Sequence, residues 1–288
     1  MRELTWDAVQ SVISDRFHEL ARRPESQQGL AEGALILAAE VRPEVDVASG
    51  IETVAEIADR TRPLVEHAAT PSTAVDALNH ALFELEGFRG NQEQYDDPRN
   101  SFLDEVLERR RGLPITLSVL YVEIARQLGL EAYGVGFPGH FLAKVVGVSD
   151  VPERERIVDP FFGTMLSLDD CAERVRAAAG EDVDLDLDWL RPVTAIEIYT
   201  RMLNNLKLGY LRQGDGLGAL GCFDRIVLLL PDAAYEFRDR GMLLERMDCV
   251  HAAIDDYMRF LELAPDDESA RPIRARRDAL SQRKPALN

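Results

Sequence analysis

A histidine and an aspartate in this sequence are spaced so that they could form a catalytic pair. His140 follows the turn Pro138-Gly139 and precedes an apolar run, and Asp159 closes the next β-branched run. Ends of adjacent antiparallel strands lie side by side, so we expect the two side chains within about 6 Å of each other. An aspartate placed in this way orients the imidazole, which can then deprotonate a thiol or hydroxyl. The spacing therefore predicts the acid and base of a hydrolase or acyl-transferase.

The element best placed to present a nucleophile to this pair is the apolar segment 114–128. It begins with Pro114, whose missing N–H costs nothing at a helix start, and it stops at Gly129, which is typical of a buried central helix. A thiol at the N-terminus of such a helix would have a lowered pKa. The cysteines are odd in number and lie elsewhere, so we expect a reducing compartment and small core side chains. They are Cys171, Cys222 and Cys249.

Patterns that could bind a cofactor or a metal are weak. Gly134, Gly136 and Gly139 match a dinucleotide fingerprint, but Pro138 interrupts it and a strand follows where a helix is needed. None of the five histidines has a second histidine four residues away or cysteines at zinc spacing. We therefore expect no cofactor and no metal.

The composition is that of an ordinary soluble protein with a strongly acidic surface. The 288 residues are 46% hydrophobic, and 51 acidic against 33 basic side chains give a net charge of −18. Such a surface repels phosphate backbones and anionic bilayers. No apolar window reaches the roughly 18 residues that span a membrane, and the N-terminal stretch lacks an apolar signal core. We expect a cytoplasmic protein without a nucleic-acid or membrane partner.

Three regions position the candidate pair. Residues 1–95 show apolar residues at three- and four-residue spacing and predict an N-terminal helical layer. Residues 96–190 combine the central helix with three predicted strands in an antiparallel meander, a helix after Ser167, and an acidic linker over 181–189. The predicted strands are 131–137, 141–148 and 154–158. The fold class is therefore α+β.

The third region, 191–288, predicts helices with an internal repeat. An offset of 34 residues superimposes Pro231 on Pro265, and the same offset pairs small and aromatic residues. These further pairs are Ala219 with Ala253, Phe223 with Tyr257, Ile226 with Phe260 and Leu229 with Leu263. The pattern resembles the tetratricopeptide repeat and predicts two helix pairs within 200–265.

A longer set of residues resembles one bacterial family, the SirB-one proteins, which combine a transglutaminase-like domain with a tetratricopeptide tail. The residues that carry the resemblance lie between about Asp96 and Leu168. They are Asn100–Leu103, Arg111–Ser118, Tyr121, Val135–Leu142 and Val158–Phe161. The resemblance implies a papain-like, transglutaminase-type core in which a buried helix packs on an antiparallel sheet.

The resemblance also implies a departure from the active enzymes. In active transglutaminase-type enzymes a cysteine opens the central helix, and the corresponding position here is Pro114. Thr116 and Ser118 are the nearest hydroxyls, and neither has the acidity of a thiol. We therefore expect His140 and Asp159 to be an inherited pair that serves structure or ligand binding.

Two functions follow from these residues. The first is a pseudoenzyme, a non-catalytic interaction or regulatory module that binds a protein partner through the helical tail or the cleft. The alternative is a hydrolase or acyl-transferase that uses His140 and Asp159 with an unusual nucleophile, either Ser118 or one of the cysteines. The missing thiol favours the non-catalytic module, and the enzyme is kept as the alternative. The sequence names no partner, pathway, substrate or oligomeric state.

Overall fold

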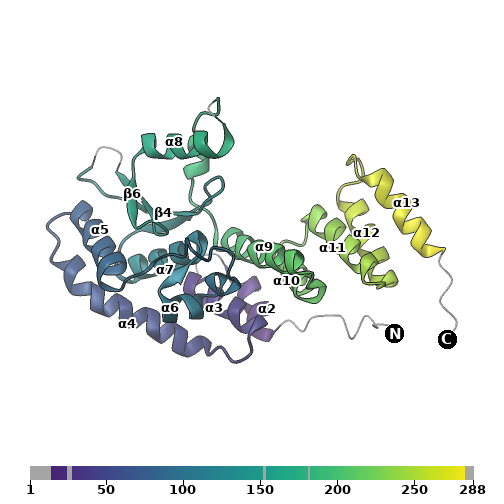
Figure 1. Cartoon of the computed structure of the whole chain (residues 1–288), viewed down its shortest axis with the longest axis horizontal. Helices are drawn as coiled ribbons and strands as arrows, with labels where there is room; N and C mark the ends of the chain where they lie inside the picture. Colours follow the sequence, from purple (N-terminus) through teal and green to yellow (C-terminus); the bar gives the residue numbers. More distant parts are fainter. Residues whose placement is uncertain (1–13, 25–27, 152–153, 181, 283–288) are drawn as a thin grey trace. The chain divides into compact units, whose positions relative to one another are not determined.

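The structure is a computed structural model that describes residues 14–24, 28–151, 154–180 and 182–282. The chain divides into two compact units (Figure 1). One unit spans Arg22–Met202. The other combines the described part of the first 21 residues with the chain from Leu203 onward.

The first unit begins with helices that match the predicted apolar periodicity. Most residues of α3 (Leu30–Val41) are buried, and α4 (Val47–Glu66) starts at Asp46, whose carboxylate accepts the N–H groups of Ala48 and Ser49. Both helices pack against the central helix. The remaining elements of this part are α5 (Pro71–Asn79), the π-helical turn η2 (His80–Leu85), β1 (Arg89–Gly90), the 3₁₀ turn η3 (Pro98–Ser101), α6 (Leu103–Arg109) and β2 (Arg111–Gly112).

The central helix, α7 (Pro114–Gln127), is buried along most of its length, as predicted. An antiparallel sheet in the order β3-β4-β5-β6 lies beside it. Figure 1 shows α7 on one side of this sheet and α8 (Leu168–Ala179) on the other. The strands are β3 (Ala132–Val135), β4 (Leu142–Val146), β5 (Glu155–Asp159) and β6 (Thr164–Leu166).

The register of the sheet confirms the predicted meander and adds a fourth strand. Val135 pairs with Leu142 and Ala143 pairs with Val158, so β3, β4 and β5 are the three predicted strands. Beyond them, β6 pairs with β5 through Asp159 and Thr164. The sequence pattern missed β6 because three mostly exposed residues show no periodicity. The two-residue strands β1 and β2, which pair in parallel, were too short to predict for the same reason.

The acidic stretch 181–189 was predicted as a linker, but three of its four apolar residues, Val183, Leu185 and Trp189, pack on the sheet, whereas Leu187 is exposed. Residue 181 lies outside the described ranges. Leu185 and Trp189 lie against the cluster formed by Val135, Leu142 and Ile157 with residues of α8. The stretch includes the 3₁₀ turn η4 (Leu187–Leu190), and Pro192 then forms a bridge with Val135. The prediction was wrong because the alternating apolar side chains have a buried partner.

A close helix contact within the first unit gives a testable expectation. Gly33 in α3 faces the buried ring of Tyr199, whose hydroxyl donates to the Gly29 carbonyl over 2.9 Å. A Cβ atom on residue 33 would lie 2.2 Å from that ring. Gly33→Ala should therefore destabilise the protein by about 1–3 kcal/mol in urea unfolding, because the ring has to move.

The matched control is a glycine-to-alanine change in a helix with free space. A Cβ on Gly209, in α9 (Ala195–Gln213), would meet nothing within 4 Å. Gly209→Ala should leave stability unchanged or raise it by up to about 1 kcal/mol, since alanine is the better helix former. Equal losses in the two variants would contradict the contact.

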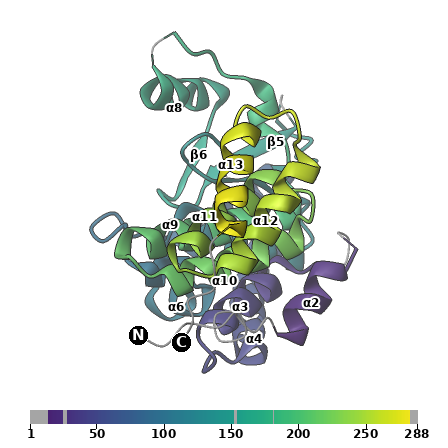
Figure 2. The same cartoon turned by 90° about the vertical axis from the view of Figure 1, so that its right-hand side faces the viewer.

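The second unit contains the predicted repeat. α10 (Gly216–Leu229) and α12 (Val250–Leu263) have the same length and start 34 residues apart. Figure 1 shows α12 between α11 (Ala234–Arg246) and α13 (Ala270–Ser281), and α12 contacts both. In Figure 2 α13 is turned toward the viewer. The equivalent residues Ala219, Phe223, Ala253 and Tyr257 are all buried in one apolar cluster. The period of 34 is thus confirmed, with α13 as an additional helix.

None of the helices in the described ranges is long and apolar enough to cross a bilayer. The division into 1–95, 96–190 and 191–288 stays a prediction about domain boundaries.

Candidate functional site

His140 and Asp159 lie in direct hydrogen-bond contact. The His140 Nε2 atom is 3.0 Å from both carboxylate oxygens of Asp159. His140 precedes β4 and Asp159 ends β5, and these two strands are neighbours in the sheet. The Asp159 side chain is fully buried, and 16% of the His140 side chain is exposed. The predicted proximity is confirmed, whereas the catalytic role of the pair stays a prediction.

Asp159 also organises the turn that follows it. Its Oδ1 atom accepts the N–H of Phe161 over 3.0 Å and that of Phe162 over 3.3 Å. The turn closes at Gly163, whose φ of 68° lies in the left-handed region that favours glycine. Asp159 is therefore a structural residue of the β5–β6 turn as well as the partner of His140.

A third charged group contacts the same carboxylate. Arg174, from α8, forms an ion pair with Asp159 Oδ2, and its guanidinium lies 5.3 Å from the centre of the Phe162 ring. Burial opposes the ionisation of Asp159, but the hydrogen bonds from His140 and Arg174 outweigh it and lower the pKa of this carboxyl. Asp159 thus stays ionised and divides its charge between two partners.

The histidine ring is fixed by aromatic neighbours. It packs edge-on against Phe161 at 5.8 Å and stacks on Phe162 at 6.0 Å between ring centres. When Nε2–H donates to Asp159, the Nδ1 atom of the neutral ring carries the lone pair. The arrangement can therefore orient the imidazole and accept a proton at Nδ1.

Arg201 holds the turn before β4. Its Nη2 atom donates to the carbonyl oxygen of His140 over 2.7 Å and to that of Phe137 over 3.2 Å. Sequence reasoning missed Arg201 and Arg174 because each comes from a helix whose position on the sheet is set by tertiary packing. An arginine in a helix carries no local signal of such a contact.

Pro114 starts α7, as the sequence predicts, and it is buried. The two nearby hydroxyls are fully buried and engaged. Thr116 Oγ1 donates to the Asn100 carbonyl over 2.7 Å and accepts the N–H of Leu113. Ser118 Oγ donates to the Phe141 carbonyl over 3.3 Å. Residues four apart share a helix face, so Pro114 lies on the same face of α7 as Ser118. That face contacts Phe141, the residue after His140.

Backbone contacts connect the start of α7 to the β5–β6 turn. Gly90 in β1 pairs with Gly112, two residues before α7, and its N–H donates to the Phe161 carbonyl over 2.8 Å. A Cβ on Gly90 would lie 2.4 Å from the Phe161 ring, so only glycine allows this approach. The predicted cleft at the N-terminus of α7 stays a prediction.

The cysteines are buried, as expected for core side chains. Burial raises the pKa of the Cys171 thiol to about 11 and that of Cys222 to about 12, and it also raises the pKa of Cys249. Thiolates are therefore scarce at neutral pH. In the part of the chain that the structure describes, no group of three His, Cys, Asp or Glu side chains is arranged to hold a metal.

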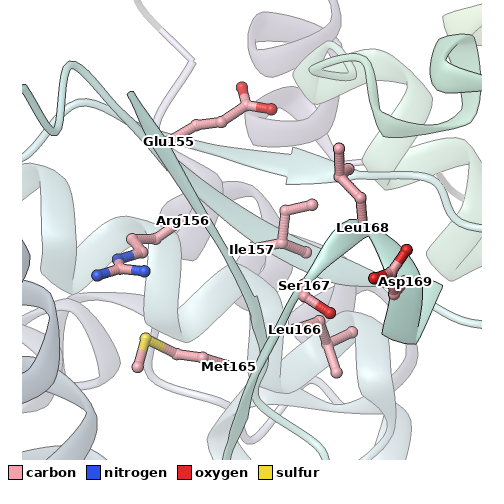
Figure 3. Close-up of a pocket in the computed structure, with 8 residues that line it drawn as sticks. All are labelled: Glu155, Arg156, Ile157, Met165, Leu166, Ser167, Leu168 and Asp169. Atoms are coloured by element: carbon pink, nitrogen blue, oxygen red, sulfur yellow. The ribbon is translucent and has the colours of Figure 1, made fainter. Parts of the chain in front are cut away.

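A cavity of about 390 Å³ lies between β5, β6 and the start of α8, away from the His140–Asp159 pair. Figure 3 shows Arg156 and Met165 on one side of the two strands and Ile157 and Leu166 on the other. Its one hydroxyl, that of Ser167, donates to Asp170 over 2.6 Å and accepts the N–H of Asp170, which caps α8. This hydroxyl is engaged in helix capping and offers no nucleophile.

Comparisons with known proteins match both halves of the chain. Residues 49–204 match the model of the transglutaminase-like superfamily, and residues 206–278 match a tetratricopeptide repeat model. The first match includes helices of the predicted N-terminal layer. No solved structure matches the chain with significance.

Several bacterial relatives share nearly the whole length. A UPF0162 protein of Xylella fastidiosa (strain 9a5c) is 33% identical over 92% of this chain and 95% of its own. A UPF0162 protein of Vibrio cholerae is 31% identical over 88% and 92%. The UPF0162 protein YchA of Escherichia coli (strain K12) is 25% identical over 85% and 90%. The chain therefore belongs to the transglutaminase-like superfamily and to the UPF0162 proteins, and tetratricopeptide repeats follow its transglutaminase-like domain.

Proposed function

We propose that this protein is a non-catalytic, transglutaminase-like module that binds another protein. The observation that carries the proposal is the state of the candidate nucleophiles. The two hydroxyls of α7 are fully buried and donate to carbonyl oxygens, and the three thiols are buried with raised pKa values. A nucleophile has to be accessible and activated by a base. None of these five groups meets both conditions.

The position of Pro114 supports the same proposal. The sequence resemblance implies that the nucleophilic cysteine of active transglutaminase-type enzymes corresponds to this residue. Proline is well suited to a first helical position, so α7 forms without the thiol. On this proposal His140 and Asp159 are an inherited pair, and the protein functions in the cytoplasm as a pseudoenzyme.

The alternative is a hydrolase or acyl-transferase with an unusual nucleophile. One observation favours it: the His140–Asp159 hydrogen bonds are intact, and Nδ1 of the ring is left to accept a proton. Ser118 or a cysteine would then have to become accessible through a rearrangement of the core.

Thiol labelling and turnover assays separate the two functions. The native full-length protein should react with iodoacetamide at no cysteine at neutral pH and at all three after unfolding. It should also turn over neither peptide amides nor esters. Turnover that Ser118→Ala or Cys171→Ala abolishes, in a variant that remains folded, would establish the alternative.

Restoring the thiol tests whether the pair is inherited. In Pro114→Cys the new thiol should be alkylated on the order of tenfold faster than in the double variant Pro114→Cys/His140→Ala, because an adjacent imidazole favours the thiolate. Equal rates in the two proteins would show that residue 114 and His140 are not partners.

Protein binding is assigned to the helical repeats. Four large apolar side chains in this region are about half exposed, and exposed apolar residues are candidate contacts for a protein partner. They are Leu208, Leu217, Tyr235 and Met258. A partner captured from the native cell by the wild-type chain should be lost when these four are replaced by serine. Retention of the partner by the substituted protein would place the interaction elsewhere.

A further inference from the structure

Arg201 is a partly buried cation anchored beside His140. Its Nη2 atom donates to the Phe137 and His140 carbonyls, and its guanidinium lies 5.3 Å from the centre of the Phe141 ring. These contacts fix the position of the charge. Its other two nitrogens, Nε and Nη1, are not buried, so their N–H groups reach solvent.

No carboxylate within the described ranges lies within ion-pair distance of Arg201. Burial lowers the pKa of this arginine, as expected for a cation without a compensating charge. Three other partly buried arginines, Arg42, Arg174 and Arg240, each pair with at least one carboxylate. A partly buried charge is costly unless an opposite charge is supplied.

Two half-exposed aromatic rings, Tyr95 and Phe162, belong to the cluster around Phe161 and His140. Tyr95 packs edge-on against Phe161, and Phe162 packs against both Phe161 and His140. Tyr95 is 48% exposed and Phe162 is 49% exposed. Tyr95 lies within electrostatic range of Arg201. The Arg201 charge thus lies near Tyr95, whose half-exposed ring offers an apolar contact.

We propose that Arg201 is the centre of a binding site for a carboxylate that is attached to an apolar or aromatic group, such as the C-terminal residue of a peptide. Guanidinium N–H groups bind carboxylates through charge-assisted hydrogen bonds. The half-exposed ring of Tyr95 contacts the apolar part of the ligand. The site is independent of whether the protein is catalytic, because it involves neither Nδ1 of His140 nor a nucleophile.

The test is a titration of the full-length chain followed by NMR at the His140 backbone amide and the Arg201 Nε–H group. N-acetylphenylalanine carries the carboxylate, N-acetylphenylalaninamide lacks it, and N-acetylaspartate amide carries it on a side chain. The first should give a saturable shift in the millimolar range. The neutral amide should bind at least about tenfold more weakly. Equal binding of the two phenylalanine compounds would overturn the proposal, and stronger binding of the aspartate compound would assign the site to acidic side chains.

Variants locate the site. Arg201→Gln should abolish the shift, and Arg201→Lys, which keeps the charge, should retain part of it. The matched control is Arg126→Gln, because Arg126 also donates to a backbone carbonyl and lies over an aromatic ring but is exposed elsewhere on the same unit. It should leave the shift unchanged. A shift that persists in Arg201→Gln, or that Arg126→Gln removes equally, would refute the assignment.

Discussion

Replacing Arg240 by methionine should destabilise the repeat region by about 3–5 kcal/mol, the usual cost of breaking a buried ion pair from one side. Arg240, in α11, donates to Asp256 in α12 over 2.6 and 2.8 Å and to Asp224 in α10 over 2.9 Å. All three side chains are at least 86% buried. Burial raises the pKa of Asp256 even with Arg240 present. Without the guanidinium, the buried carboxylates of Asp224 and Asp256 would have lost the cation that they share.

Hydrogen exchange of α10, α11 and α12 in the full-length chain measures this loss. The control is Arg277→Met, because Arg277 pairs with its exposed neighbour Asp278, and such a pair contributes at most about 1 kcal/mol. The triple variant Asp224→Asn/Arg240→Met/Asp256→Asn should recover part of the stability, since it removes all three charges. A loss in Arg240→Met no larger than in the control would refute the role of the triad.

Replacing Asp159 by asparagine should destabilise the first unit by about 3 kcal/mol at neutral pH. The buried carboxylate accepts hydrogen bonds from His140, Arg174 and two backbone N–H groups. An asparagine can still accept from the backbone, but its NH₂ group would meet the donors of His140 or Arg174. Urea unfolding followed by circular dichroism measures the difference. Asp169→Asn, an exposed change in the first turn of α8, should cost less than about 1 kcal/mol.

The pH dependence of this difference has a defined sign. The pKa of Asp159 is lower in the folded than in the unfolded protein, so its contribution is complete above the unfolded value of about 3.9. The contribution is lost as the pH falls through the folded value. The stability curves of wild type and Asp159→Asn should therefore converge in acid. A difference that stays constant down to the acid transition would contradict the assigned ionisation.

The His140–Asp159 contact could be predicted because it depends on local sequence. Each residue stands at the end of an apolar run, and adjacent antiparallel strands bring such ends together. The repeat could be predicted for a similar reason, since Phe223 and Tyr257 occupy equivalent positions 34 residues apart in two successive copies of the repeat. In both cases the spacing along the chain determines the position in space.

The contacts that could not be predicted depend on packing between distant elements. Arg174 reaches Asp159 because α8 packs over the sheet, and Arg201 reaches the His140 carbonyl from α9. No residue spacing encodes either arrangement. The stretch 181–189 was misjudged for the same reason, because its apolar residues are recognisable as core only when the β3–β4 surface is known.

The double role of Asp159 has a consequence for judging activity in related sequences. Its carboxylate accepts two N–H groups of its own turn and the Arg174 guanidinium, so loss of the residue would impair folding whether or not the protein is an enzyme. Natural selection for a folded turn is then sufficient to keep the aspartate whether or not catalysis is also selected. A His–Asp pair of this kind is therefore a poor diagnostic of turnover in this family. If the proposed function is correct, the residue at the start of the central helix, Pro114 here, is the more informative marker for genome annotation.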